Sequence, residues 1–165
     1  MLIFTRHDRY LAAIVDLTEK EWDTKLMHYV IAKMIVLDDS SSDDPARASK
    51  ALYIRSRHIC LAVDIIKSRE LNRALFRDVL YQAAETACES GARSTGIFYY
   101  AHCLMLLQDD PWDEDKPDVS YQETLQLFVR SAECYWHQNM LDEALALIRT
   151  TFKKAKDPGK IIFSL

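Results

Sequence analysis

Two stretches of the sequence carry large and small residues at matching helical offsets, and this spacing limits the folds open to the chain. The first stretch has its matching positions at Arg77, Leu80, Ala84, Ala87, Gly96 and Tyr100. The second has them at Leu125, Phe128, Ala132, Tyr135, Asn139, Ala144 and Ile148. Small residues such as Ala84 and Gly96 allow two helix backbones to come close, and large residues fill the space beside them. Each stretch therefore predicts two antiparallel helices packed on each other.

Offsets of this kind are typical of tetratricopeptide (TPR) repeats, in which stacked helix pairs form a solenoid. The two stretches lie further apart than the usual period of about 34 residues, so we expect an acidic insertion around Trp112 to separate them. The chain has only 3 Gly and 4 Pro among its 165 residues, too few for many β-hairpin turns. We expect an all-α fold: an irregular stack of antiparallel helix pairs, a TPR-like α-solenoid fragment of about six helices.

Capping residues mark the helix ends at several points of the chain. Thr18 and Ser120 each precede a glutamate by three residues, the spacing of a capping box. Gly91 is placed to end a helix in the left-handed conformation, and Asn139 is expected both as a turn residue and as the N-cap of the last helix. Together with apolar periodicity, these signals predict helices over about residues 18–37, 51–67, 70–90, 94–108, 120–138 and 140–156.

Two acidic segments interrupt the helical pattern. Residues 38–49 (DDSSSDDPARAS) predict a mobile surface loop, and residues 108–120 predict an acidic linker between helix pairs. Ser40, Ser41 and Ser42 stand beside acids, as in the substrates of acid-directed kinases, and an unmodified loop is the alternative. We expect residues 1–165 to form a single helical domain. The apolar ending 161–165 (IIFSL) starts an element without finishing it, which indicates a fragment of a longer protein or a truncated product.

A partner-binding groove can be placed on the first helix of each predicted pair. In a TPR unit, fixed positions of this helix face the concave side of the stack. The groove positions predicted in this way are Asp78, Tyr81, Glu85 and Cys88 in the first unit, and Gln126, Val129, Glu133 and Trp136 in the second. Tyr81 and Trp136 are the expected anchors, because aromatic side chains dominate interface energetics. The alternative for Trp136 is burial against a further helix pair.

The sequence resembles a region of certain large signalling proteins. The similar residues are the run 104–112 (LMLLQDDPW), Tyr121, Leu125, the run 132–135 (AECY) and Ala144, with an earlier helix at 28–35 (HYVIAKMI). In those proteins, which include fungal hybrid histidine kinases and bacterial multi-domain sensor kinases, a kinase-like domain and an AAA/STAND-type ATPase module precede the helical region. A GAF domain and a histidine kinase follow it. The chain departs from the family pattern at Asn139, at Gly96 and at residues 64–66 (DII), and these departures leave the subfamily open.

No pattern of catalytic or metal-ligating residues stands out. The chain lacks the phosphate-binding loop G-x-x-x-x-G-K-[ST], the H-R-D and D-F-G motifs of protein kinases and a phosphoacceptor-histidine box. Acidic pairs such as Asp109 and Asp110 fall in loops, where nothing tunes them for proton transfer. We expect no catalytic residue, cofactor or metal site. Structural or surface histidines are expected at His7, His28, His58, His102 and His137, and buried free thiols at Cys60, Cys88, Cys103 and Cys134.

These features favour an interaction protein over an enzyme. The resemblance implies a non-catalytic protein–protein interaction scaffold that relays state between the ATPase and the sensor or kinase modules of a histidine kinase phosphorelay protein. Its partners would be other proteins or neighbouring domains of its own parent chain, and the apolar ending 161–165 would favour self-association. The alternative is a stand-alone small helical ligand-binding protein or enzyme, which would need a buried pocket with convergent polar groups.

Three further expectations concern partners and location. A net charge of -4 argues against nucleic acid as the main partner, because phosphate binding needs a basic surface. No apolar run approaches the ~20 residues that a membrane span requires. The N-terminus lacks the pattern of a secretory signal, so we expect a cytoplasmic protein that binds neither nucleic acid nor membrane.

Overall fold

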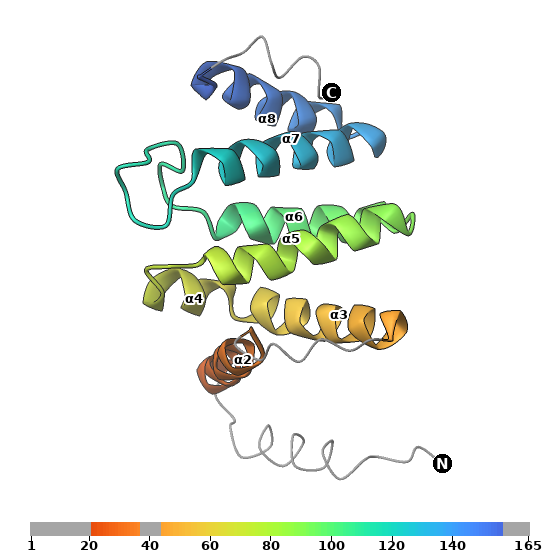
Figure 1. Ribbon diagram of the computed structural model, residues 1–165, viewed down its shortest axis with the longest axis vertical. Helices are drawn as coiled ribbons and strands as arrows, with labels where there is room; N and C mark the ends of the chain where they lie inside the picture. Colours follow the sequence, from red (N-terminus) through yellow and green to blue (C-terminus); the bar gives the residue numbers. More distant parts are fainter. Residues whose placement is uncertain (1–20, 37–43, 157–165) are drawn as a thin grey trace.

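The computed structural model describes residues 21–36 and 44–156, which fold into a vertical stack of helices (Figure 1). The helices of this described part are α2 (Glu21–Val36), α3 (Pro45–Leu61), α4 (Val63–Arg69), α5 (Ala74–Glu89), α6 (Arg93–Met105), α7 (Tyr121–His137) and α8 (Leu141–Lys154). Residues 21–36 and 44–156 contain no strand, so the all-α prediction is confirmed. The predicted capping box at Thr18, the serines Ser40, Ser41 and Ser42 and the apolar ending 161–165 lie outside the described residues.

The helix predicted over residues 51–67 differs from the structure at both ends and in the middle. Its start lies earlier, at Pro45, because the Asp44 carboxylate accepts a hydrogen bond of 3.0 Å from the Ala46 N–H and proline suits the first turn. Residues 45–49 are therefore helical, and the prediction of a loop there was wrong. The helix also breaks at Ala62, which separates α3 from α4 and raises the count above the six predicted.

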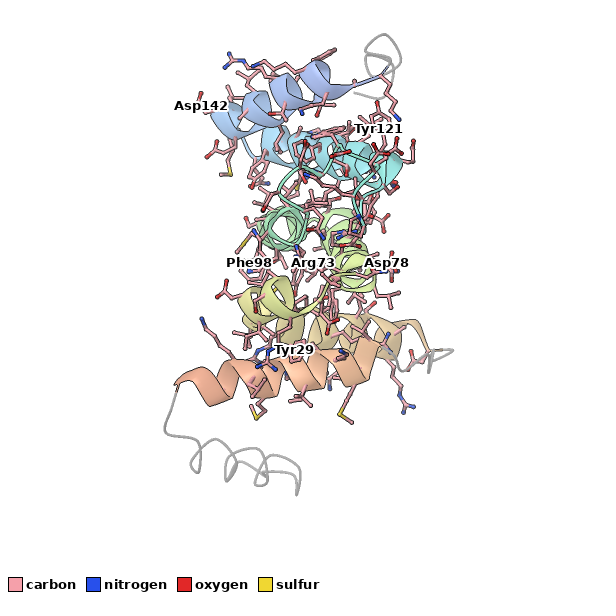
Figure 2. The ribbon with its side chains drawn as sticks, turned by 90° about the vertical axis from the view of Figure 1, so that its left-hand side faces the viewer. Tyr29, Arg73, Asp78, Phe98, Tyr121 and Asp142 are labelled. Carbon is pink, nitrogen blue, oxygen red and sulfur yellow. The ribbon has the colours of Figure 1, made fainter. Side chains whose placement is uncertain are left out.

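The helix predicted from Glu70 begins only at Ala74. Arg73 occupies its N-cap position, and the Arg73 guanidinium donates hydrogen bonds to four backbone carbonyls near the ends of α4 and α6. The acceptors are the carbonyl oxygens of Lys67 (2.9 Å), Glu70 (3.0 Å), Leu106 (3.4 Å) and Leu107 (3.3 Å). Carbonyls at a helix C-terminus lack partners within the helix. Arg73 lies in the interior of the stack (Figure 2), where it satisfies two such ends at once.

Most of the predicted turn and helix-capping residues have the expected conformation or contact. Gly91 ends α5 with φ +84°, the left-handed conformation, and the Ser120 hydroxyl accepts a hydrogen bond of 3.4 Å from the Glu123 N–H. Asn139 adopts φ +58°, as suits a turn residue at the end of α7. The prediction that Asn139 is the N-cap of the last helix was wrong, because Met140 takes that position.

From α3 upward, the long helices of the stack run antiparallel to their neighbours (Figure 1). Helices α5 and α6 form one layer and α7 and α8 the next, while α3 packs below α5 and α2 crosses α3 (Figure 1). Close packing of α5 on α6 depends on small residues: Ala83, Ala84 and Ala87 are fully buried. A Cβ atom at Gly96 of α6 would overlap the Cys88 sulfur and lie 3.2 Å from the Ala84 carbonyl oxygen, which confirms the predicted close approach.

Residues 106–120, which include the predicted acidic linker, connect α6 to α7 without a helix and lie at one side of the stack (Figure 1). Trp112 is one of the residues that attach them to the stack: its ring packs edge-on against Phe128 and Tyr121 of α7 at centroid distances of 5.2 and 5.8 Å. Across the described ranges, none of the helices combines the length and the apolar character needed to cross a membrane.

Candidate interaction surfaces

Side-chain contacts join α5 to α7 along the length of both helices. The contacting pairs, in order along the helices, are Arg77 with Glu123, Tyr81 with Gln126, Glu85 with Arg130, and Cys88 with Cys134. Their shortest distances are 2.5, 2.9, 2.7 and 3.2 Å. The pairs advance together along both helices, so α5 and α7 run parallel, as the first helices of successive pairs in a solenoid do. We call this surface the α5–α7 face.

At the start of the α5–α7 face, Arg77 is buried between two carboxylates. Its guanidinium donates to Asp118 at 2.7 and 3.1 Å and to Glu123 at 2.5 and 3.0 Å. Burial alone would lower the pKa of Arg77, but the hydrogen bonds to Glu123 and Asp118 outweigh it and raise the pKa above its usual value. Arg77 therefore remains a cation whose charge is balanced inside the protein.

Beside this cluster lies a cleft of about 480 Å³ between α5 and the start of α7. Three predicted groove residues, Asp78, Tyr81 and Gln126, line it together with Arg77 and Glu123. Within the cleft, the Gln126 amide donates to the Tyr81 hydroxyl at 2.9 Å, and Asp78 accepts a hydrogen bond of 2.8 Å from Gln82 of its own helix.

A second, smaller cleft of about 230 Å³ lies further along the α5–α7 face. Arg130 of α7 bridges Glu85 of α5 (2.7 Å) and Glu133 of its own helix (2.8 Å), and the buried Tyr100 hydroxyl donates to Glu85. The hydrogen bond to Glu85 is the main cause of a raised Arg130 pKa. The predicted residues Glu85, Cys88 and Glu133 line this cleft, and the structure brings them together through Arg130 and Cys134.

The two remaining predicted groove residues lie apart from these clefts. Val129 is half-buried on α7. Trp136 is 54% exposed and lines a third cleft, of about 400 Å³, with Glu133, His137 and Ile148. Within the part of the chain that the structure describes, the predicted aromatic anchor Trp136 is therefore exposed to solvent.

A separate, largely apolar groove lies between α3 and α6, and the sequence analysis missed it. The groove has a volume of about 760 Å³, and we call it the α3–α6 groove. Ile54, Leu61 and Phe98 line it, with 45%, 43% and 50% of their surface exposed. Its floor includes Tyr53 and Tyr99, whose rings stack at 6.1 Å. Figure 2 shows Phe98 and Asp78 on opposite sides of the α5–α6 layer, so this groove and the α5–α7 face point away from each other.

A signal for the α3–α6 groove was present in the sequence. The run 97–100 (IFYY) places four large apolar or aromatic residues in succession on α6. Successive residues of a helix point about 100° apart, so the four cannot all face one core. Tyr99 and Tyr100 are buried, which leaves Phe98 pointing outward.

Comparison with protein-family models, curated proteins and solved structures found no match. Among the described residues, no group of three or more His, Cys, Asp or Glu side chains is placed to hold a metal ion.

Two pairs of residues that are far apart in the sequence nevertheless meet. His28 of α2 and His58 of α3 place their Nδ1 atoms 2.9 Å apart, and the sulfur atoms of Cys88 and Cys134 lie 3.2 Å apart. Sequence spacing gave no sign of either pair, because each joins two helices of different layers.

Proposed function

We propose that this chain is a non-catalytic protein–protein interaction scaffold and that the α3–α6 groove is its main docking surface. The observation that carries the proposal is the exposure of Ile54, Leu61 and Phe98 along one concave surface. Large apolar side chains grouped in this way are typical of binding sites, because burying them against a partner is favourable. Tyr53 and Tyr99 add aromatic surface to the same groove.

The shape and charge of the groove favour an amphipathic helix as the occupant. A groove between two helices accepts the apolar stripe of a third, with anchors at positions i, i+3, i+4 and i+7. Lys50 and Arg57 of α3 are exposed cations along the same groove, seven positions apart. They would pair with acidic residues about two turns apart on the bound helix. The proposed partner is therefore an apolar helix flanked by Asp or Glu.

The resemblance to multi-domain sensor kinases supplies a setting for this scaffold. In that setting the stack of helix pairs is TPR-like, and the partner helix belongs to a neighbouring ATPase, sensor or kinase module of the same parent protein. Binding in the α3–α6 groove would relay the state of one module to the next. This part of the proposal rests on the residues 104–112 and 132–135 that carry the resemblance.

A binding experiment with a defined probe tests the docking surface. The probe is a labelled helical peptide with leucines at i, i+3, i+4 and i+7 and glutamates on both flanks, and its charge-reversed control carries lysines instead. We expect fluorescence anisotropy to show binding of the acidic peptide only. Phe98→Ala should weaken this binding by about tenfold or more without lowering the melting temperature.

Leu71→Ala is the matched control variant, because Leu71 is also strongly exposed but does not line the groove. It should leave both binding and melting temperature unchanged. Equal binding of the acidic and the charge-reversed peptide, or binding that survives Phe98→Asp, would rule the groove out as the docking surface. In a longer parent chain with a kinase module, an autophosphorylation rate unaffected by Phe98→Asp would argue against the signalling role.

A further inference from the structure

The sulfur atoms of Cys88 and Cys134 are close enough for chemistry between them. Cys88 lies near the end of α5 and Cys134 near the end of α7, and their Sγ atoms are 3.2 Å apart. A disulfide bond is about 2.05 Å long, so a movement of roughly 1.2 Å would join them. Both thiols are free in this structure. Cys88 is half-buried, whereas Cys134 is buried.

The first turn of α6 holds both sulfur atoms in place. Gly96 leaves the space that the Cys88 sulfur fills, since a Cβ atom at this position would overlap it. The Cys134 thiol is directed toward the Arg93 carbonyl oxygen at 3.7 Å. Three helices thus converge on the pair, and the contact between the thiols depends on a glycine that is otherwise unfavourable inside a helix.

The second cleft of the α5–α7 face gives access to the pair from solvent. It has a volume of about 230 Å³, and both cysteines line it beside Arg93, Arg130 and His137. The carboxylates of Glu85, Glu89 and Glu133 line the same cleft, and Arg130 is paired with two of them, so the cleft does not select for a negatively charged molecule. Cys60 and Cys103 are different: Cys103 is fully buried and neither lines this cleft.

We propose that Cys88 and Cys134 form a dithiol site that is converted to an intramolecular disulfide by exchange with a small disulfide, such as oxidised glutathione. The Cys88 thiolate attacks one sulfur of the small disulfide, and the other sulfur leaves as a thiolate that takes up a proton. Cys134 then gives its proton to solvent and attacks Cys88 Sγ, which breaks the mixed disulfide and releases the second small thiol. In total, two protein thiols are oxidised and one small disulfide is reduced to two thiols.

The environment of Cys134 assigns it the second step. Burial, together with the hydrogen bond to Cys88, raises the pKa of Cys134 to about 12. A thiol that ionises so reluctantly is a poor first nucleophile in solution, and it lies deeper than Cys88. Once Cys88 carries the small thiol, Cys134 is the thiol adjacent to the sulfur that must be attacked. The resulting bond would fix the ends of α5 and α7 to each other and close the chain between residues 88 and 134 into a loop.

Peptide mapping tests this site directly, because trypsin places the four cysteines on four different peptides: 58–67, 78–93, 94–130 and 131–149. The full chain is equilibrated with oxidised glutathione, alkylated and digested without reductant. We expect peptides 78–93 and 131–149 to be linked, with a mass two hydrogen atoms below their sum. We also expect the melting temperature to rise by about 5 to 10 °C and to return when dithiothreitol is added.

Variants separate the proposed pair from other thiol chemistry. Cys88→Ser and Cys134→Ser should each abolish the link, whereas Cys60→Ser should leave it intact. Gly96→Ala, which displaces the Cys88 sulfur, should slow the formation of the link by about tenfold or more. A link that involves Cys60 or Cys103, a mixed disulfide that stays on Cys88, or four unlinked peptides from the wild-type chain would each overturn the proposal. This inference does not depend on the α3–α6 groove.

Discussion

Arg77 and Asp118 form an ion pair from which water is almost completely excluded. A guanidinium nitrogen lies 2.7 Å from a carboxylate oxygen, and the two side chains are 2% and 1% exposed. Charges buried to this degree cost several kcal/mol unless each finds a partner. The pair joins α5 to the residue that precedes the α7 cap by two positions, and Glu123 extends it into α7 itself. The second helix pair is therefore positioned on the first by buried charge as well as by apolar packing.

Asp118→Asn should destabilise the protein by about 2 to 4 kcal/mol, because it leaves the buried Arg77 with only one carboxylate partner, Glu123. Asparagine is the appropriate replacement since Asp118 has φ +62° and asparagine tolerates the left-handed region. Urea unfolding followed by circular dichroism measures the change. Asp115→Asn, on an exposed residue of the same segment, should change the stability by less than about 0.5 kcal/mol. If the two variants lower the free energy of unfolding equally, the ion pair between Arg77 and Asp118 contributes little to stability.

Gly96→Ala should destabilise the protein by about 1 to 2 kcal/mol, although alanine is the better helix former. The added methyl group would overlap the Cys88 sulfur and press on the Ala84 carbonyl oxygen. Thermal unfolding of the variant measures the loss.

The cause of this loss can be isolated with a second substitution. In a Cys88→Ala background the overlap with sulfur is gone, so the cost of Gly96→Ala should fall by about 1 kcal/mol in a double-mutant cycle. An additive cycle would show that the Cys88 contact is not the source. Gly91→Ala serves as a reference for backbone strain alone: φ is +84° there and a Cβ atom would meet nothing within 4 Å. Its cost should be about 1 kcal/mol.

The spacing of small and large residues predicted much of the helix pairing. Ala84 and Gly96 lie where α5 and α6 approach closely, as their small size predicted. Gly91 ends α5 and Ser120 caps the start of α7, as expected. This success has a physical reason, since packing between neighbouring helices in sequence depends on short-range periodicity, which the sequence displays directly.

Features that depend on distant contacts could not be predicted in the same way. Alanine is the best helix former, yet Ala62 breaks the second predicted helix so that α4 can bury Val63, Ile65 and Ile66 in the core. Likewise, the acidic segment 108–120 reads as a solvated linker, and nothing local marks Asp118 as the buried partner of Arg77. In both cases tertiary packing overrides the local preference.

Truncation of Trp136 on α7 and of Trp112, which packs against α7, should differ in its cost to stability. Trp136 is 54% exposed, so Trp136→Ala should change the free energy of unfolding by less than about 1 kcal/mol. Trp112 packs edge-on against Phe128 and Tyr121 and attaches the acidic segment to α7. Trp112→Ala should therefore cost about 2 to 4 kcal/mol. Urea unfolding of both variants gives the comparison. If Trp136→Ala proves as destabilising as Trp112→Ala, Trp136 is part of the core and not a partner-binding anchor.

The contact between α2 and α3 should weaken in mild acid, because it contains a pair of histidines. The Nδ1 atoms of His28 and His58 lie 2.9 Å apart, so one hydrogen fits between them and the two rings cannot both be protonated without repulsion. Burial is the main cause that lowers the pKa of each ring below 6.5, and the nearby Arg57 lowers it further. For His58, the charge of His28 adds to these two effects.

The direction of the pH effect follows from these lowered pKa values. When the pKa is lower in the folded state, the unfolded chain binds more protons, so stability is full above pH 6.5 and declines as the pH falls through the region below it. We expect the urea midpoint to fall between pH 7.5 and pH 5.5, and this fall to be smaller in both His28→Asn and His58→Asn. Because the pair acts as a unit, the double variant should lose little more of the pH dependence than either single one. Met34→Gln, an exposed neutral change on α2, should keep the wild-type pH dependence. A wild-type pH dependence in the histidine variants as well would place the acid sensitivity outside this helix contact.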